Sequence, residues 1–398
     1  MTSPRRAEAP PGEPDAAWRV SLRAAEIEAG PGSLSRLGDL AVELGGRRVL
    51  LVSDPGLEAA GHVARACDSL VHAGVQFELF VGVEENPTEA CVERGLAAAR
   101  RLEPDLLVAL GGGSVMDATK GVNFLLTNGG RMEDYWGFGK AKRPMLPSIG
   151  VPCTAGTGSE AQSFALISRN VDHVKMACGD AKARFTRVLL DPEVLETVPR
   201  DVAAITGMDA LSHAVESFAT RTRNPISTAF AAAAWRLLDA AFPPLMRSNP
   251  GHDAREQMLA GAYLAGAAIE TSMLGLAHAL ANPLTARHGV THGIAVGLVL
   301  PNVVRFNGEL CEPIYRQLVS VSPGESAAEA LALRLEELRA LAGLPETLEA
   351  AGVAEAEIDA LATAAAAQWT AAHNPRPAEP AQLSELYRRS LEAKEAIA

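Results

Sequence analysis

Short runs of apolar, often β-branched residues alternate with longer amphipathic segments through the first half of the chain. Four of these runs predict β-strands: RRVLLVSD (47–54), VQFELFVG (75–82), DLLVALGGG (105–113) and RPMLPSIGVPC (143–153). Two of the segments between them predict helices: LEAAGHVARACDSLVHAG (57–74) and ACVERGLAAARRL (90–102). Strands and helices that alternate at this spacing are typical of βαβ units. We therefore expect a parallel sheet covered by helices on both faces.

The pattern changes near Asp191 and Pro192. From about residue 200 onward, segments rich in Ala and Leu dominate and no convincing strand pattern remains, so the second half predicts an all-helical domain. Residues 1–17 are rich in Pro, Ala and charge, which predicts a flexible tail. We therefore expect an α/β domain over 18–195 and a helical domain over 196–398.

The composition is that of a soluble globular protein, with 48% hydrophobic and 21% charged residues among 398. The formal net charge is −12, and no basic run is longer than a pair, which disfavours binding to nucleic acid or to an anionic membrane surface. The stretch from Leu259 to Ala281 is long enough to raise the question of a membrane span. Glu270 in its middle and several Ala and Gly residues favour a buried core helix instead.

The five cysteines are scattered, odd in number and without a CxxC pair, which is typical of a reducing compartment rather than of a disulfide framework. The N-terminus has early arginines but no apolar segment after them, so a secretory signal is not predicted. These features together predict a cytoplasmic protein.

A glycine-rich turn, ALGGGSVMDATKG (109–121), follows the third predicted strand and begins a helix. Glycines let the backbone approach an anion closely, and the start of a helix offers free N–H groups and the positive end of a dipole. A dinucleotide pyrophosphate would bind well there, so 18–195 is predicted to bind a dinucleotide. Three glycines in a row are equally typical of a plain tight turn, and the motif is not the GxGxxG of the commonest dinucleotide fold.

A second turn, CTAGTGSE (153–160), follows the fourth predicted strand. The hydroxyls of Thr154 and Thr157 could bind the same cofactor, although Thr157 or Ser159 could also simply cap a helix. Asp54, at the end of the first predicted strand, could bind an adenosine ribose and would repel a 2′-phosphate. This favours NAD over NADP, while Asp-Pro-Gly is also an ordinary turn.

Acidic and imidazole side chains with metal-ligand spacing lie in the second half. Asp209 and His213 stand four residues apart in GMDALSHAVES (207–217), so a helix would place them on one face. Taken alone, the pair is more typical of an Asp at a helix N-cap with a partner histidine. The segment GLAHALANPLTARHGVTHG (275–293) adds three histidines. A helix, a turn and a second helix there could bring His278 and His292 together. Four such ligands would form a mixed oxygen and nitrogen site suited to Fe²⁺ or Zn²⁺.

With these motifs in order along the chain, the sequence resembles the iron-containing (group III) alcohol dehydrogenases. The resemblance runs from about residue 25 to the C-terminus. Its matching segments are GVEENPT (82–88), ALGGGSVMDATKG, TAGTGSE, GMDALSHAVE, GLAHALANPL, THG and NPRP. It implies a Rossmann-like α/β domain, of the kind also found in dehydroquinate synthase, that binds NAD(P). It also implies a helical domain that carries the metal.

The family's functional residues can be carried over where the motifs match. Metal ligands are implied at Asp209, His213, His278 and His292. Cofactor contacts are implied at Asp54, Asn86, Gly112, Gly113, Ser114, Asp117, Thr154 and Lys175, the last across a less patterned stretch.

One position departs from the family pattern. Family members commonly carry a second histidine four residues after the first in this stretch, beside the substrate, where it helps to move a proton. Here that position is Asn282, so the resemblance implies an intact metal site but leaves the proton relay open. His288 and His373 are candidates to replace the missing histidine, against the alternative that each is a surface or structural residue.

The resemblance implies a metal-dependent enzyme that oxidises a small alcohol reversibly to an aldehyde or ketone, with a homodimer as the expected assembly. Three alternatives stay open at this stage. One is a lyase of the dehydroquinate synthase type, which would need a cluster of Lys and Arg for a phosphorylated substrate. The second is a hydroxyacid–oxoacid transhydrogenase with tightly held cofactor. The third is a non-catalytic protein that binds metal or nucleotide.

Overall fold

The computed structural model describes residues 25–171 and 174–391, so the predicted tail over 1–17 lies outside the described residues. The described chain divides into two compact units. The α/β unit contains 25–203 together with 249–266, and the helical unit contains 204–248 together with 267–391. The chain thus leaves the α/β unit at 203, returns to it at 249 and leaves it again at 266.

A six-stranded sheet forms the centre of the α/β unit, and every pair of neighbouring strands in it is parallel. In spatial order its strands are β1 (Glu26–Ala29), β9 (Arg187–Leu190), β6 (Ser148–Pro152), β4 (Leu106–Gly111), β2 (Arg48–Val52) and β3 (Gln76–Phe80). The four strands predicted from the sequence correspond to β2, β3, β4 and β6. The predicted parallel α/β domain is therefore confirmed.

Five strands were not predicted. Two of them, β1 and β9, extend the large sheet at one edge. The other three form a separate sheet in the order β5 (Gly137–Phe138), β8 (Lys175–Gly179) and β7 (Phe164–Ser168), in which β7 and β8 are antiparallel. All five are short, and β1 and β5 are largely exposed, so these two lack the continuous apolar run of a buried parallel strand.

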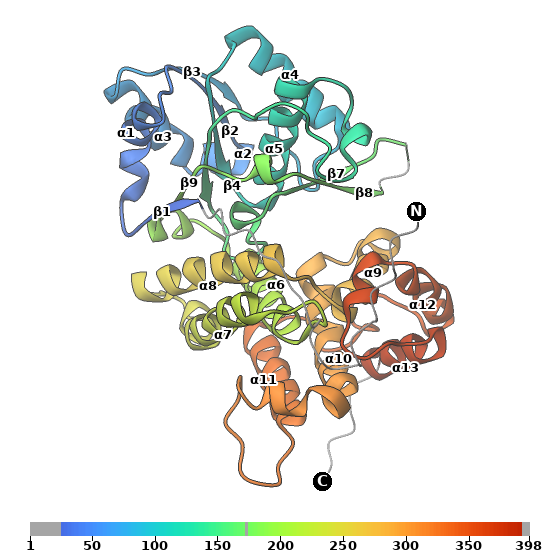
Figure 1. The fold of residues 1–398 in the computed structure, drawn as a ribbon. Helices are drawn as coiled ribbons and strands as arrows, with labels where there is room; N and C mark the ends of the chain where they lie inside the picture. Colours follow the sequence, from blue (N-terminus) through green and yellow to red (C-terminus); the bar gives the residue numbers. More distant parts are fainter. Residues whose placement is uncertain (1–24, 172–173, 392–398) are drawn as a thin grey trace. The chain divides into compact units, whose positions relative to one another are not determined.

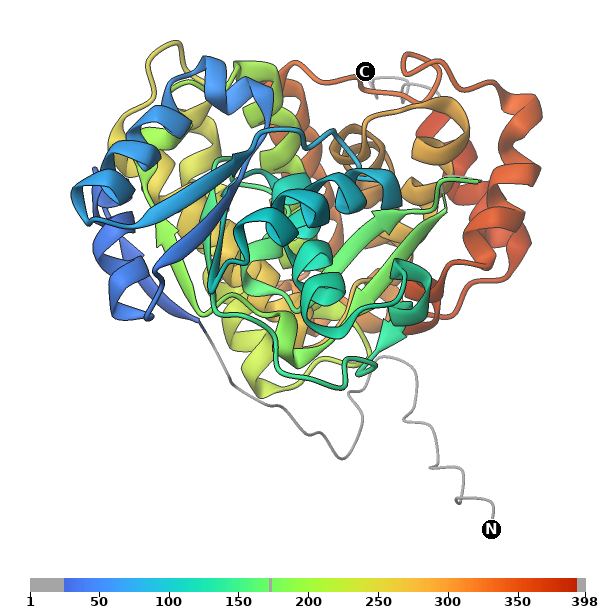
Figure 2. The same cartoon turned by 90° about the horizontal axis from the view of Figure 1, so that it is seen from above.

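Helices cover both faces of the large sheet. The helices of this part of the chain are α1 (Leu37–Glu43), α2 (Pro55–Ala59), α3 (His62–His72), α4 (Glu89–Leu102) and α5 (Gly113–Asn128). In Figure 1, α1 and α3 lie on one side of the sheet and α4 and α5 on the other. Helix α5 also packs against β7, so it lies between the two sheets (Figure 2). The predicted helix over 57–74 is interrupted at Gly61, whose φ of 84° breaks the helical path.

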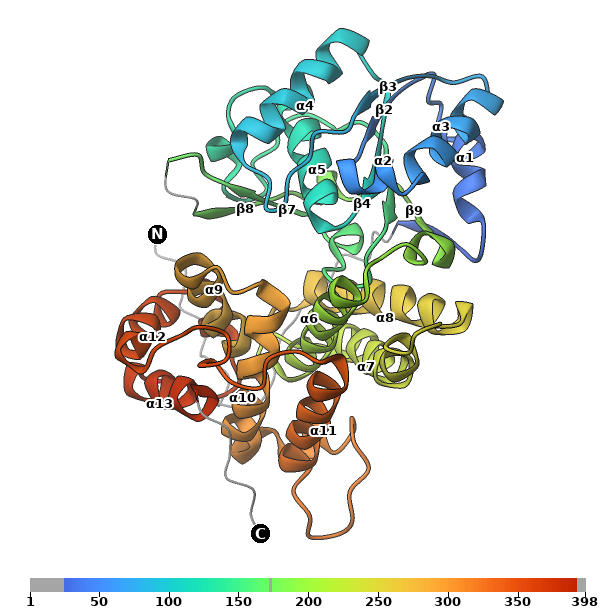
Figure 3. The same ribbon diagram turned by 180° about the vertical axis from the view of Figure 1, so that it is seen from behind.

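The helical unit has no β-strand among its described residues, as predicted. The helices from residue 200 onward are α6 (Arg200–Ala219), α7 (Pro225–Leu245), α8 (His252–Thr271), α9 (Leu276–His288), α10 (His292–Tyr315), α11 (Ala327–Ala342), α12 (Ile358–Ala366) and α13 (Pro380–Leu391). Helix α10 lies at the centre of this unit, with α9 and α13 packed on one side and α11 on the other (Figure 3).

The single apolar helix predicted over Leu259–Ala281 is wrong. Helix α8 ends at Thr271 and α9 begins at Leu276, and the two helices are bent by 104° at the break. Within the described residues, α10 alone is long and apolar enough to cross a membrane by length and composition. Two thirds of its apolar window is buried inside the protein, which is typical of a core helix.

The second half of α8 packs tightly on the turn that follows β6, through Ala262 and Gly266. Gly158 adopts a left-handed φ of 59°, and a Cβ on Gly266 would lie 2.3 Å from the carbonyl oxygen of Gly158. The two backbones therefore touch at a place where neither residue can carry a side chain. Glu160, in the same turn, is buried, and burial raises its pKa to about 7 against the smaller opposing effects of its own backbone N–H and of Lys120.

We predict that Gly266→Ala destabilises the α/β unit by about 2 kcal/mol or more, because the added methyl group has no room beside the Gly158 carbonyl. Thermal unfolding measures the effect. Gly251→Ala is the matched control, since a Cβ at that exposed position meets nothing within 4 Å. Equal melting temperatures for the two variants would contradict the close contact.

We also predict that Glu160→Gln changes the pH dependence of stability. The folded pKa of about 7 lies above the ordinary value of 4.5, so the stabilising contribution of the neutral carboxyl is complete below pH 4.5 and is lost as the pH rises through 7. The melting temperature of Glu160→Gln minus that of the wild type should therefore rise between pH 5 and pH 8, by the equivalent of up to about 3 kcal/mol. A difference that stays constant over this range would contradict the buried position of the carboxyl group.

Candidate functional site

The strand order of the large sheet reverses between β2 and β4. A reversal of this kind is where ligands commonly bind, at the carboxyl ends of the strands. From β2 the chain continues to β3 on one side, and the later strand β4 pairs with β2 on the other side. Because the strands are parallel, their carboxyl ends meet at one edge, and helices that run to opposite faces leave a crevice at the reversal. Asp54 follows β2 at this edge, and the glycine turn follows β4.

The glycine turn (109–121) lies against the second predicted turn (153–160), which we call the threonine turn. Gly112 precedes the first residue of α5 and provides no side-chain cap, so the N–H groups at this helix start have no side-chain acceptor at the cap position. A Cβ on Gly112 would lie 3.2 Å from Thr154 Oγ1, and a Cβ on Gly113 would lie 2.7 Å from Thr157 Cγ2. Two predicted cofactor segments, more than forty residues apart, thus form one surface at the start of α5.

Ser114 and Asp117 connect this helix start to its surroundings. Ser114 Oγ accepts a hydrogen bond from the backbone N–H of Asn86, which has a positive φ of 54°. Asp117 is buried and accepts a hydrogen bond of 2.7 Å from the Ser159 hydroxyl. Burial raises the pKa of Asp117, and the charge of Lys120 is the largest effect that opposes this rise. Asp117 therefore contacts the second turn from inside the protein.

Lys120 was missed by the sequence analysis. Its ammonium group is buried and donates hydrogen bonds to the carbonyl oxygens of Ser159 and Phe164, at 2.7 and 2.8 Å. A lysine three residues after Asp117, on one of the more apolar helices of this unit, was the signal that could have identified it. This side chain ties α5 to the threonine turn.

Asp54 and Lys175 are the remaining predicted cofactor residues. Asp54 Oδ1 accepts a hydrogen bond of 3.1 Å from the N–H of Leu57, so it caps α2, whereas the alternative considered from the sequence was an ordinary Asp-Pro-Gly turn. Lys175 begins β8 and is exposed, and its charge slightly lowers the pKa of Asp117. Both lie in the α/β unit with the turns described above.

Three of the four predicted metal ligands, Asp209, His278 and His292, place ligand atoms within 4.8 Å of one another in the helical unit, and the fourth, His213, lies beside Asp209. Asp209 and His213 lie one turn apart inside α6, His278 lies in the first turn of α9, and His292 is the first residue of α10. The Nε2 atoms of His213, His278 and His292 lie 3.4, 3.7 and 3.8 Å from Asp209 Oδ1. In a tetrahedral site with bonds of about 2.1 Å, ligand atoms are roughly 3.4 Å apart. The interpretation of Asp209 as a helix N-cap is wrong, because α6 begins at Arg200.

Burial and unmet polar groups fit a cation at this place. Asp209 and His278 are 6% and 4% exposed, and neither Asp209 Oδ1 nor His278 Nε2 has a hydrogen-bond partner within the described part of the chain. Burial raises the pKa of Asp209, but the three imidazoles outweigh burial and hold this pKa well below its ordinary range. Burial lowers the pKa of His278, but the carboxylates of Asp209 and Glu216 outweigh it and raise this pKa to about 9. The centre therefore stabilises positive charge.

Glu216 is a second residue that the sequence analysis missed. Its Oε2 atom lies 2.6 Å from Nδ1 of His278, on the ring edge opposite Nε2. Glu216 is seven residues after Asp209, two turns along the same face of α6. The spacing was visible in GMDALSHAVES, but the partner on α9 was not.

Asn282 and the two histidine candidates for proton transfer, His288 and His373, lie at different places on the helical unit. Asn282 is one turn after His278 in α9, and its amide donates a hydrogen bond of 3.0 Å to Gln368 Oε1. His373 lies at the other end of the same short segment as Gln368, with its ring 6.3 Å from that of Trp369. His288 is the last residue of α9, roughly 15 Å along the helix from His278, and its Nδ1 lies 3.6 Å from Glu357.

Comparisons with known proteins agree with this architecture. A model of iron-containing alcohol dehydrogenase matches residues 24–192, and a model of the C-terminal domain of the Fe-containing alcohol dehydrogenase family matches residues 203–391. An NAD-dependent methanol dehydrogenase of Bacillus methanolicus is 30% identical, over 91% of this chain and 97% of that protein. A 1,3-propanediol dehydrogenase of Klebsiella pneumoniae is 32% identical, over 91% and 96%.

Solved structures agree as well. An alcohol dehydrogenase from Oenococcus oeni superposes with a TM-score of 0.90 at 28% identity, over 94% of this chain and 100% of that one. The resemblance inferred from the sequence motifs is thereby confirmed. The chain belongs to the iron-containing alcohol dehydrogenase family, and with it to the metal-dependent alcohol oxidoreductases.

Proposed function

We propose that this protein oxidises a small alcohol reversibly to an aldehyde or ketone, with NAD as cofactor and a divalent metal held by Asp209, His213, His278 and His292. The observation that carries the proposal is that one carboxylate and two imidazoles, from three helices, place ligand atoms within 4.8 Å of one another, with a third imidazole 3.4 Å from the same carboxylate oxygen. Mixed oxygen and nitrogen ligands without a thiolate are typical of a catalytic rather than a structural metal site.

The proposed ligand residues contribute differently to this metal centre. A divalent metal bound here supplies Lewis acidity toward an alcohol oxygen, and bound NAD supplies the hydride acceptor. Asp209 contributes the negative charge that offsets part of the metal's charge, while the imidazoles contribute neutral nitrogen ligands. The His292 side chain is 30% exposed, against 7% for His213 and 6% for His278. Substrate would therefore approach from the side of His292.

The start of α5 supports the cofactor assignment. Uncapped N–H groups and a backbone free of side chains at Gly112 and Gly113 favour a pyrophosphate, for which Ser114, Thr154 and Thr157 offer additional hydroxyl donors. Asp54 stands at the reversal of strand order, where its carboxylate would bind ribose hydroxyls and repel a 2′-phosphate. We therefore propose NAD rather than NADP, with Asn86, Asp117 and Lys175 as further contacts or supports.

The proton released from the alcohol needs an acceptor other than residue 282. The amide of Asn282 can orient a hydroxyl group but does not exchange a proton near neutral pH. Of the two histidine candidates, His373 precedes Asn374, whose side chain contacts the start of α9, the end of that helix that carries His278. We propose His373 rather than His288 for this role, because His288 lies at the opposite end of α9.

The names of the relatives support a proposal for the substrate class. They include dehydrogenases of methanol and 1,3-propanediol and a lactaldehyde reductase. A short aliphatic alcohol or diol is therefore the substrate class that we propose for this chain, with iron as the first metal to test and zinc as the second. A homodimer and a cytoplasmic location stay predictions from the sequence.

The test is NADH absorbance with a panel of short alcohols, after the purified protein has been loaded with Fe²⁺ or Zn²⁺. We predict that His278→Ala lowers kcat/KM at least about 10³-fold and abolishes metal retention on dialysis, because it removes a ligand and leaves Asp209 with one partner fewer. His252→Ala, at an exposed position of the α/β unit, is the matched control. Full activity of metal-free His278→Ala would contradict the proposal. Bound NAD and metal without turnover of any alcohol would favour a binding protein.

A second variant tests the cofactor turn separately. We predict that Gly113→Ala weakens NAD binding roughly tenfold, about 1.4 kcal/mol, because the new methyl group pushes Thr157 into the surface that receives the pyrophosphate. Isothermal titration with NAD measures the dissociation constant. Metal content should stay at the wild-type level, since the metal ligands belong to the other unit. An unchanged affinity for NAD would remove the glycine turn from the cofactor site.

A further inference from the structure

The carboxylate of Glu216 has two roles at the beginning of α9. Its Oε1 accepts a hydrogen bond of 2.7 Å from the N–H of Ala277, in the first turn of this helix, where the N-cap residue Gly275 has no side chain to act as acceptor. Its Oε2 lies 2.6 Å from Nδ1 of His278 and 3.4 Å from the backbone nitrogen of the same residue. One buried side chain, 5% exposed, thus fixes both the start of the helix and the ring that this start carries.

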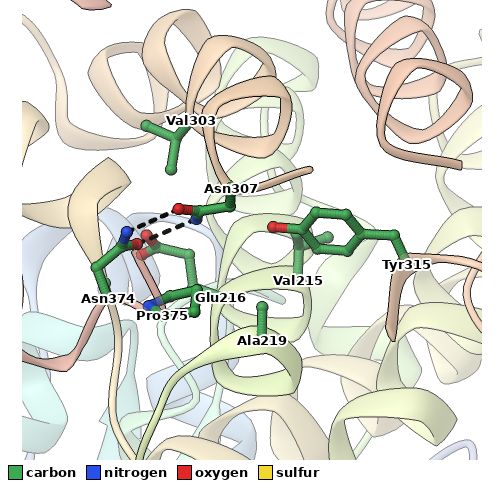
Figure 4. Close-up of a pocket in the computed structure, with 9 residues that line it drawn as sticks. Val215, Glu216, Ala219, Val303, Asn307, Tyr315, Asn374 and Pro375 are labelled. Atoms are coloured by element: carbon green, nitrogen blue, oxygen red, sulfur yellow. Dashed lines mark hydrogen bonds between the residues drawn. The ribbon is translucent and has the colours of Figure 1, made fainter. Parts of the chain in front are cut away.

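A pair of asparagines completes the support of this helix start. Asn307 in α10 and Asn374 exchange reciprocal side-chain hydrogen bonds of 3.1 and 2.7 Å, which Figure 4 shows as dashed lines. Asn374 Oδ1 also accepts the N–H of Leu276 at 3.3 Å, and its amide donates to the carbonyl oxygen of Arg376. Both amides are almost fully buried. The N–H groups of Leu276 and Ala277 therefore each point at a side-chain oxygen.

Gly275 lets these two acceptors come close to the helix start. A Cβ at this position would lie 2.9 Å from Asn374 Oδ1 and 3.0 Å from Glu216 Oε1. The cavity between the residues of Figure 4 measures only about 10 Å³, so it cannot receive a substrate. In the same view the hydroxyl group of Tyr315 points toward Asn307. The cluster is packed for support rather than for ligand binding.

We propose that Glu216 is the positioning residue that fixes His278 as a metal ligand, with Asn307, Asn374 and Gly275 holding the helix start around it. A carboxylate on Nδ1 keeps the ring proton at that nitrogen and leaves Nε2, which faces Asp209, as the ligand atom. This inference rests on the proposed metal site. It adds that the strength of this site depends on a residue that does not contact the metal.

The test compares Glu216→Gln with a matched control, Glu312→Gln. Glu312 also lies in the helical unit and also accepts the first N–H groups of a helix, those of Ala327 and Ala328 in α11, but α10 places it roughly 30 Å from His292. The two substitutions remove the same charge from the same kind of cap. Only Glu216→Gln also replaces an acceptor beside an imidazole.

The readout is the rate at which a chromogenic chelator removes Zn²⁺ from the loaded, full-length protein. We expect release from Glu216→Gln to be about 10- to 100-fold faster than from the wild type, and release from Glu312→Gln to stay within about twofold. The visible absorption spectrum of the Co²⁺-loaded protein should change in Glu216→Gln alone, because it reports ligand geometry. Thermal unfolding of the metal-free proteins shows how much stability each cap contributes.

Gly275→Ala provides an independent route to the same result. It adds one methyl group without changing any charge or ligand, and it should speed Zn²⁺ release by displacing Glu216 and Asn374. Wild-type release rates and Co²⁺ spectra in both Glu216→Gln and Gly275→Ala would overturn the role of Glu216 while leaving the proposed function intact. A wild-type protein that retains no metal would overturn both.

Discussion

A carboxylate buried among three imidazoles is the interaction on which the helical unit depends. Asp209 is shielded from water inside α6, and a buried charge of this kind is costly unless an opposite charge or several donors compensate it. The imidazoles supply that compensation only when they carry a proton or share a cation. The N-terminal ends of α9 and α10 consequently lie around one carboxylate oxygen of Asp209. After the bend between α8 and α9, Nε2 of His278 lies 3.7 Å from that oxygen.

Much of the fold could be predicted from the sequence because its strongest signals are local. Strands β2 and β4 are continuous apolar runs, as strands buried on both faces must be, whereas β1 and β5 are short, exposed and carry no such run. The break between α8 and α9 was missed because Ala and Gly residues read as one apolar stretch across Thr271 and Gly275. At the break, Glu216 and Asn374 accept hydrogen bonds from the first N–H groups of α9, and these two acceptors come from 60 to 100 residues away.

The candidate site likewise contains some residues that could be predicted from the sequence and others that could not. The positions of Asp209 and His213 follow from helical spacing alone, and the helix, turn and helix that join His278 to His292 could be anticipated. Lys120 and Glu216 stand out in the sequence by charge and spacing, but their roles could not be assigned, because the role of a buried charge follows from partners that the sequence does not show. Ser159 and Phe164 surround Lys120, and His278 lies against Glu216, through contacts that no periodicity encodes.

The path of the chain between the two units has a consequence for how this protein can be dissected. Residues 249–266 belong to the α/β unit although they come after the first helices of the other unit, so between residues 25 and 391 the backbone passes between the units three times. No single cut yields two complete fragments. A fragment that stops at residue 203 would lack Gly266 and would leave the Gly158 turn without its covering helix. To exchange one whole unit with that of a relative, the chain would have to be joined at three places, whereas a protein whose two domains follow one another needs one junction.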